Sequence, residues 1–92
     1  MIQSFRDARA SKLLACERVR ELVNIETQAR ARLIRLDAAT SLDDLRAIRG
    51  NRLEALKGDR AGTFSIRIND QFRICFRWEE KGPCDVEITD YH

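Results

Sequence analysis

The sequence predicts an α+β fold, with an N-terminal strand and two helices packed on an antiparallel sheet. Apolar residues recur at helical spacing in the first half of the chain, between residues 8 and 39. From residue 64 onward, apolar and polar residues alternate, as they do in strands that bury one face. The 92 residues suffice for one modest core, so residues 1–92 are expected to form a single domain.

Caps and spacing define the elements of the first half. A short strand is expected over residues 2–5. Asp7 is a residue type that caps helices, so a helix is expected from there to about Arg20. A second helix is expected over residues 25–39 because its apolar residues share one stripe. The pair Thr40-Ser41 predicts a cap followed by a short helical turn.

Alternation defines the second half. Residues 53–56 fit a short strand, and a loop over residues 58–62 separates it from three longer strands. The side chains expected to face inward are Phe64, Ile66, Ile68, Phe72, Ile74, Phe76, Trp78, Val86 and Ile88. The longer strands therefore predict an antiparallel meander whose apolar face is covered by the helices. Lys81-Gly82-Pro83 is expected to form its last turn.

The first long hairpin has a defined register. Its apolar residues share one face only if Ile68 pairs with Phe72, which leaves residues 69–71 as a three-residue loop. Arg67 then lies opposite Arg73, with no carboxylate evident beside them. Like charges placed opposite each other destabilise a sheet. The two arginines are therefore either kept for an anion or simply part of a solvated face.

The second hairpin is less constrained. Its apolar residues share a face if Trp78 pairs with Val86. That pairing places Arg77 opposite Glu87. A shift of two residues preserves the same faces, so it is also allowed.

Composition excludes several classes of protein. No apolar run approaches the roughly 20 residues that cross a membrane, and no apolar signal-peptide region follows the start, so we expect a cytoplasmic protein. The cysteines, Cys16, Cys75 and Cys84, form no Cys-x-x-Cys pair, a pattern that fits reduced thiols. With one histidine in the chain, no metal or cofactor is expected. Arginine makes up 14 of the 17 basic residues, and its planar guanidinium suits contact with phosphate.

The one histidine is the last residue, His92, which follows Asp90 and Tyr91. Histidine is the side chain that titrates near neutral pH. A strand-like segment, residues 85–89, leads to it and would carry it to the edge of the sheet. Position alone leaves two interpretations open, a solvated chain end or a group that performs acid–base chemistry.

Two motifs of the chain are specific, Leu-Lys-Gly-Asp-Arg at residues 56–60 and Asp-Tyr-His at residues 90–92. Together with residues 65–69 and 71–76, they resemble the HigB toxins of the RelE-like superfamily of toxin–antitoxin systems. The resemblance implies a small α+β endoribonuclease that enters the ribosomal A site and cuts mRNA there. It also implies a helix-turn-helix antitoxin of the HigA type, through which alone the complex contacts operator DNA.

The resemblance implies functional roles for Lys57, Arg73, Asp90, Tyr91 and His92. Metal-free RNA cleavage needs a base for the 2′-hydroxyl, cations for the phosphate and an acid for the departing 5′-oxygen. We expect Arg73 and Lys57 to hold the phosphate. His92 is the expected acid and Asp90 is expected to orient it. Tyr91 is expected to stack on a base or to supply its hydroxyl.

One position departs from the family pattern. Some relatives carry a functional histidine just ahead of the Leu-Lys-Gly-Asp-Arg motif, where this chain has Glu54. Glu54 is therefore either the base or the mark of a lost function. Arg67, Gln71 and Arg60 are expected to contact RNA, although Gln71 stands where some relatives have asparagine. Three helix arginines form either a solvated face or a contact with ribosomal RNA: Arg30, Arg32 and Arg35.

Two competing functions stay open from the sequence. The chain is a non-catalytic RNA- or protein-binding module of the same fold if Glu54 has abolished catalysis. Alternatively, its main task is to form a complex with the antitoxin and to tune operator binding. New mRNA ends would distinguish the enzyme from both alternatives.

Overall fold

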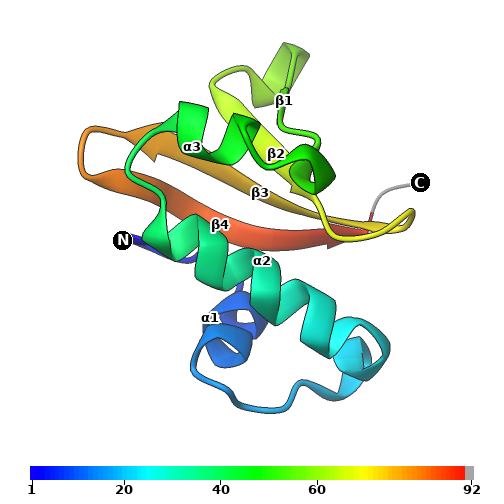
Figure 1. Ribbon diagram of the computed structural model, residues 1–92. Helices are drawn as coiled ribbons and strands as arrows, with labels where there is room; N and C mark the ends of the chain where they lie inside the picture. The colour runs from blue at the N-terminus through cyan, green and yellow to red at the C-terminus, as the bar shows by residue number, and fades with distance from the viewer. Residues whose placement is uncertain (91–92) are drawn as a thin grey trace.

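The computed structural model describes residues 1–90 and has α+β architecture (Figure 1). Its α-helices are α1 (Ala8–Leu14), α2 (Glu26–Ala38) and α3 (Leu42–Arg46), and its 3-10 helices are η1 (Arg20–Ile25), η2 (Arg49–Asn51) and η3 (Gly58–Arg60). Its strands are β1 (Glu54–Ala55), β2 (Thr63–Arg67), β3 (Phe72–Glu79) and β4 (Gly82–Asp90). Within residues 1–90, no helix is both long and apolar enough to span a membrane.

The four strands form one antiparallel sheet in the order β1-β2-β3-β4. α1 and α2 lie together on one side of this sheet (Figure 1). The core between the two layers is built from helix residues such as Leu13, Leu33 and Leu36 and from strand residues such as Ile66 and Ile74, all fully buried. Alternation in the second half therefore predicted the apolar face of the sheet correctly.

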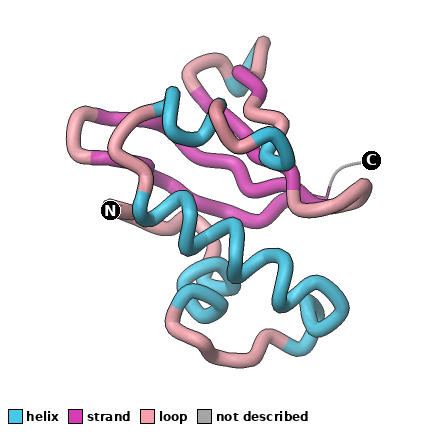
Figure 2. The backbone as a smooth tube through the Cα atoms, viewed as in Figure 1, coloured by secondary structure: helices cyan, strands magenta, loops and turns pink. Residues whose placement is uncertain are grey.

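The expected strand over residues 2–5 is not a regular strand. This segment runs beside the outer edge of β4 (Figure 2) and makes a single parallel bridge, between Phe5 and Val86. Gln3 N donates to Pro83 O over 2.8 Å, and the next contacts of the segment are with Val86. A bulge in β4 lies between Pro83 and Val86 and interrupts the ladder, so a continuous strand cannot form.

The first helix is shorter than expected. α1 ends at Leu14 instead of near Arg20, because Cys16 adopts a left-handed backbone with φ 65°. The guanidinium of Arg30 caps this helix end, with Nε donating to Leu13 O over 2.8 Å. Arg30 therefore has a structural task and does not belong to a purely solvated face. The later cap is as expected, since Ser41 Oγ accepts from the backbone N of Asp44 over 3.2 Å.

The hairpin of β2 and β3 has the predicted register. Ile68 N donates to Phe72 O over 2.9 Å, which closes the three-residue loop. Arg67 lies directly opposite Arg73.

The hairpin of β3 and β4 has a different register from the preferred prediction. Its turn is Glu80-Lys81, and Trp78 pairs with Pro83 rather than with Val86. Continued regularly, this pairing would turn Glu87 into the core. A bulge at Asp85, with φ 53°, inserts one residue and returns Val86 and Ile88 to the apolar face. Beyond the bulge, Glu87 lies opposite Cys75, which corresponds to the alternative shift of two residues.

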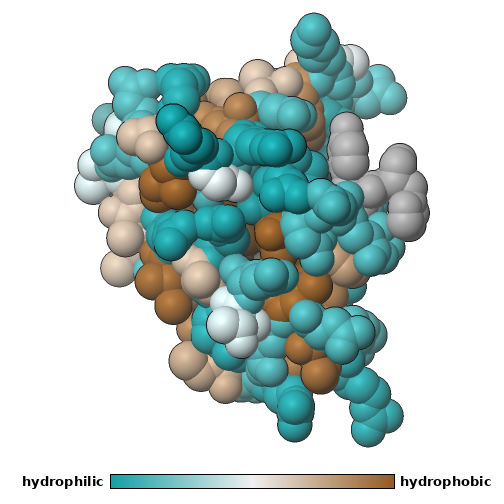
Figure 3. Space-filling model, turned by 45° about the vertical axis from the view of Figure 1, so that its right-hand side comes forward, coloured by the Kyte–Doolittle hydropathy of each residue, from teal (hydrophilic) through white to brown (hydrophobic). Residues whose placement is uncertain are grey.

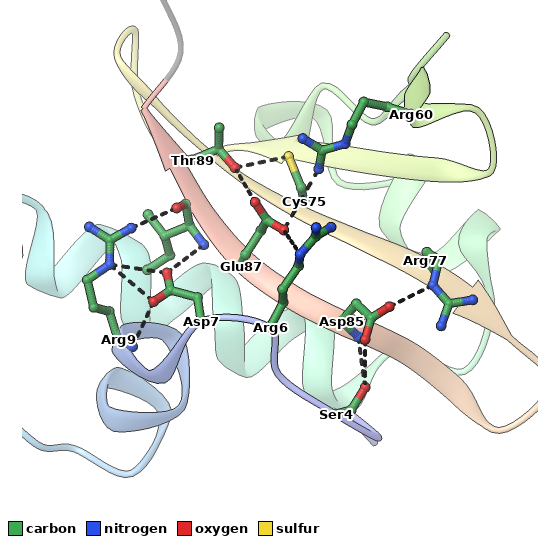
Figure 4. Close-up of polar contacts among 11 residues, drawn as sticks. Ser4, Arg6, Asp7, Arg9, Arg60, Cys75, Arg77, Asp85, Glu87 and Thr89 are labelled. Atoms are coloured by element: carbon green, nitrogen blue, oxygen red, sulfur yellow. Dashed lines mark hydrogen bonds and ion pairs between the residues drawn. The ribbon is translucent and has the colours of Figure 1, made fainter. Parts of the chain in front are cut away.

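Asp7 joins α1 to β4. One carboxylate oxygen accepts from the backbone N of Arg9 over 2.9 Å, and the other accepts from the backbone N of Ile88 over 3.1 Å (Figure 4). Arg9 Nη2 donates to Ile88 O over 3.0 Å. Burial opposes ionisation, but the hydrogen bonds from Arg9 and Ile88 outweigh it and lower the pKa of Asp7.

We expect Asp7→Ala to lower the free energy of unfolding by about 1–2 kcal/mol near neutral pH, because it removes the helix cap and the tie to β4. The lowered pKa means that this stabilisation is present above the ordinary value of 3.8 and is lost as the pH falls through the folded-state pKa. Urea unfolding near pH 7 and near pH 3 measures the difference. Asp43→Ala, at a carboxylate that is 88% exposed, is the control. An equal loss from the two variants near pH 7 would contradict the assignment.

Gly82 begins β4 with φ +136°, and a Cβ there would lie 2.5 Å from Met1 O. Gly58, by contrast, has φ +65° and open space around it. We expect Gly58→Ala to cost about 1–2 kcal/mol for its left-handed backbone. Gly82→Ala is expected to cost more, because a backbone clash is added. Thermal unfolding of the two variants checks the order, and a smaller shift for Gly82→Ala would refute it.

Candidate functional site

The side of the sheet opposite α1 and α2 carries three of the candidate residues, Glu54, Arg67 and Arg73. We call it the polar sheet face, and its residues are Glu54, Thr63, Ser65, Arg67, Arg73, Cys75, Arg77, Glu87 and Thr89. Two adjacent rows cross it. Ser65, Cys75 and Glu87 form one row, and the other is formed by Arg67, Arg73 and Thr89.

Arg73 lies in the middle of the polar sheet face and is only 7% exposed. Its Nε donates to Ser65 Oγ over 2.8 Å, and its Nη2 donates to Arg52 O over 2.9 Å. Arg52 adopts a left-handed backbone with φ 44° directly after η2. Two segments that are distant in sequence therefore hold the guanidinium from one side.

Arg67 has a local partner that the sequence did not make evident. Its guanidinium forms an ion pair with Asp70, in the loop between β2 and β3. The three-residue loop returns the chain so that Asp70 reaches back to Arg67. The expectation of two opposed arginines without a nearby carboxylate was therefore wrong for Arg67.

A second ionic group surrounds Glu87 (Figure 4). Its carboxylate lies 3.5 Å from Arg6 Nε and 3.9 Å from Arg60 Nη2. Thr89 Oγ1 lies 3.4 Å from both Glu87 Oε1 and Cys75 Sγ. Arg60, a predicted RNA contact, thus reaches from η3 across the sheet. Glu87 and Arg6 were not predicted as site residues, although alternation could have placed Glu87 on this face.

Glu54 and Lys57 lie at the exposed edge of the sheet. Glu54 is in β1, directly opposite Ser65, so it shares the polar sheet face. Lys57 is exposed and precedes η3. Gly58 and Gly62 have φ values of 65° and 90°, as expected for turn glycines. This edge therefore presents a carboxylate on β1 and an ammonium group directly before the turn.

Asp90 and Gln71 lie apart from the other candidates among residues 1–90. Gln71 Nε2 donates to Asp90 Oδ2 over 3.2 Å, and Asp90 lies opposite Phe72 at the end of the sheet. Alternation along β4 places Asp90 on the side of Ile88, away from the polar sheet face. Tyr91 and His92, both predicted to be catalytic, lie outside the described residues.

Positive charge also gathers where α2 approaches the end of β2. Partial burial lowers the pKa of Arg32, and the neighbouring guanidinium groups of Arg35 and Arg67 lower it further. Positive charges that cluster in this way create a potential that attracts anions. Figure 3 shows the side of the molecule where β4 ends, and hydrophilic residues cover most of it.

Together, these residues offer cations for a phosphate on a largely buried platform, with carboxylates at its margins. A buried guanidinium such as that of Arg73 suits a multiply charged anion because it forms directed hydrogen bonds. The described residues of the site contribute no histidine, since His92 is the only one in the chain.

Comparison with known proteins identifies the family of the chain. Residues 3–92 match the family model of the RelE-like toxin of the type II toxin–antitoxin system HigB. Toxin HigB-1 of Vibrio cholerae serotype O1 (strain ATCC 39315 / El Tor Inaba N16961) is 46% identical to the chain over 55 residues. That alignment covers 60% of the chain and 58% of the relative, which is less than two thirds of its length. Because the family model spans nearly the whole chain, the protein belongs to the HigB family of RelE-like toxins of type II toxin–antitoxin systems.

Proposed function

We propose that the protein is a ribosome-dependent endoribonuclease that cleaves mRNA in the A site and so inhibits translation. The observation that carries this proposal is the buried guanidinium of Arg73, held on the polar sheet face beside Arg67. Membership in the HigB family supports it. In this proposal the nucleophile is the 2′-hydroxyl of the RNA, so DNA is not cleaved.

The proposed reaction has three requirements, and the chain offers a group for each. Arg73 and Lys57, supported by Arg67, stabilise the additional negative charge on the pentacovalent phosphate. Charge stabilisation of this kind is usually the largest contribution to catalysis, and removing one donor costs roughly 10²- to 10³-fold in rate. Glu54 accepts the proton of the 2′-hydroxyl, and His92 protonates the departing 5′-oxygen. The product is a 2′,3′-cyclic phosphate.

The remaining assignments concern positioning of the acid and binding of the RNA. Asp90 orients His92, and Tyr91 stacks on a base or supplies its hydroxyl. Arg60 and Gln71 contact the RNA. The ion pair of Arg60 with Glu87 is partly exposed, and such pairs hold little free energy, so a phosphate can displace it.

The partner in this proposal is a helix-turn-helix antitoxin that restrains the toxin in the cytoplasm. The complex binds operator DNA through the antitoxin. The family membership supports an antitoxin partner.

Cleavage in a reconstituted translation reaction tests the activity. Primer extension on a reporter mRNA is expected to show new 5′ ends that require ribosomes. Arg73→Ala is expected to slow their appearance by about 10²- to 10³-fold, and His92→Gln by about 10²- to 10⁴-fold. Arg46→Ala, at an exposed arginine of α3, is the matched control and is expected to retain the activity of the unaltered protein.

Two results would contradict this proposal. If His92→Gln formed new ends at the rate of the unaltered protein, the assignment of His92 as the acid would be wrong. No new ends from the folded, unaltered protein would favour a non-catalytic binding module, and Glu54→His would then be the variant to examine.

The positive charge near Arg32 gives a separate expectation about binding. If Arg32 and Arg35 contact ribosomal RNA, replacing both with glutamine flattens the slope of log affinity against log salt by about 0.7 for each lost phosphate contact. Ribosome binding measured across a salt series gives this slope. The control of equal charge is a double variant in which two exposed arginines, Arg18 and Arg46, are replaced with glutamine. A double variant with an unchanged slope would assign these two arginines to a merely solvated face.

A further inference from the structure

Ser65 is a fully buried polar residue at the centre of the polar sheet face. Its side chain does not belong to the hydrophobic core, which its strand neighbours Phe64 and Ile66 contact instead. Its hydroxyl oxygen accepts the hydrogen bond from Arg73 Nε, over 2.8 Å. Its backbone O lies 3.5 Å from Arg73 Nη2.

We propose that Ser65 and the backbone carbonyl of Arg52 are positioning groups that orient the guanidinium of Arg73 toward the RNA phosphate. This inference rests on the proposed function, in which Arg73 binds that phosphate. It assigns a specific task to a serine that was not among the site residues predicted from the sequence.

The two acceptors bind different nitrogens of the guanidinium. Ser65 takes Nε, and Arg52 O takes Nη2 over 2.9 Å. Acceptors on two different nitrogens fix both the position and the rotation of a planar group. Both acceptors are neutral, so these hydrogen bonds orient the cation without neutralising its charge.

The carbonyl of Arg52 is itself held in place. η2 ends at Asn51, which is fully buried and whose Nδ2 donates to Leu45 O over 3.2 Å. The left-handed backbone of Arg52, φ 44° and ψ 58°, then directs its carbonyl to Arg73. The turn after α3 thus reaches a side chain in the centre of the sheet.

Single-turnover cleavage on programmed ribosomes tests the positioning. We expect Ser65→Ala to lower the maximal rate by roughly 10- to 100-fold, since displacing a positioned group by about 1 Å can cost about 10²-fold. The ribosome concentration that gives half the maximal rate is expected to stay unchanged. Ser65→Cys keeps the size and supplies a weaker acceptor, so its rate is expected to lie between those of serine and alanine. Thr63→Val, on the same strand and face, is the matched control.

A double variant isolates the path through Arg73. If Ser65 acts only through Arg73, then Ser65→Ala causes no further loss in an Arg73→Ala background. Added guanidinium ion is expected to restore part of the rate of Arg73→Ala, and to restore less when Ser65 is also alanine. A merely structural effect of Ser65 would not depend on guanidinium in this way. Thermal unfolding of each variant confirms that it is folded.

The outcomes separate this inference from the proposed function. A normal rate for Ser65→Ala beside an impaired Arg73→Ala would overturn the positioning role alone, as would losses that multiply in the double variant. A normal rate for Arg73→Ala would overturn the phosphate-binding role on which the inference rests.

Discussion

The register of β3 against its two neighbours decides where the site side chains of β2, β3 and β4 lie. Against β2, a three-residue loop sets Arg67 opposite Arg73 and keeps the apolar residues together. Against β4, the tight turn alone would set a register that places Glu87 on the apolar face. The bulge at Asp85 shifts that register by one residue and returns Val86 and Ile88 to the core. A one-residue slip would bury Glu87 in the core and expose Val86, at a cost far above that of the strained Asp85 backbone. Burial of the apolar residues thereby determines which side chains lie on the polar sheet face.

The buried guanidinium of Arg73 follows from that order. A polar group loses its contacts with water on burial, so it is stable only where the fold supplies hydrogen-bond acceptors. Ser65 comes from the neighbouring strand and Arg52 from the turn after η2. The centre of the sheet and the turn that leads into β1 therefore depend on each other. A guanidinium held by fixed acceptors is preorganised, so it can stabilise an anion without first rearranging.

Ion pairs at the margins of the polar sheet face have a different character. Glu87 lies between Arg6 and Arg60, and Asp70 pairs with Arg67. Arg6 and Arg60 are well exposed, and exposed pairs contribute little to stability. The face therefore combines one firmly held arginine with several arginines whose partners are replaceable. A protein of net charge +2 can therefore still carry strong local positive charge on this face.

The sequence by itself determined the features that depend on neighbouring residues. Asp7 and Ser41 predicted their caps, and alternation predicted the apolar face and the register of β2 with β3, because pleating and loop length are local constraints. It also carried the family motifs. Only the tertiary structure decided the end of α1, the bulge at Asp85 and the orientation of Arg73. Each of these depends on contacts between segments far apart in the chain, and local spacing contains no information about such contacts.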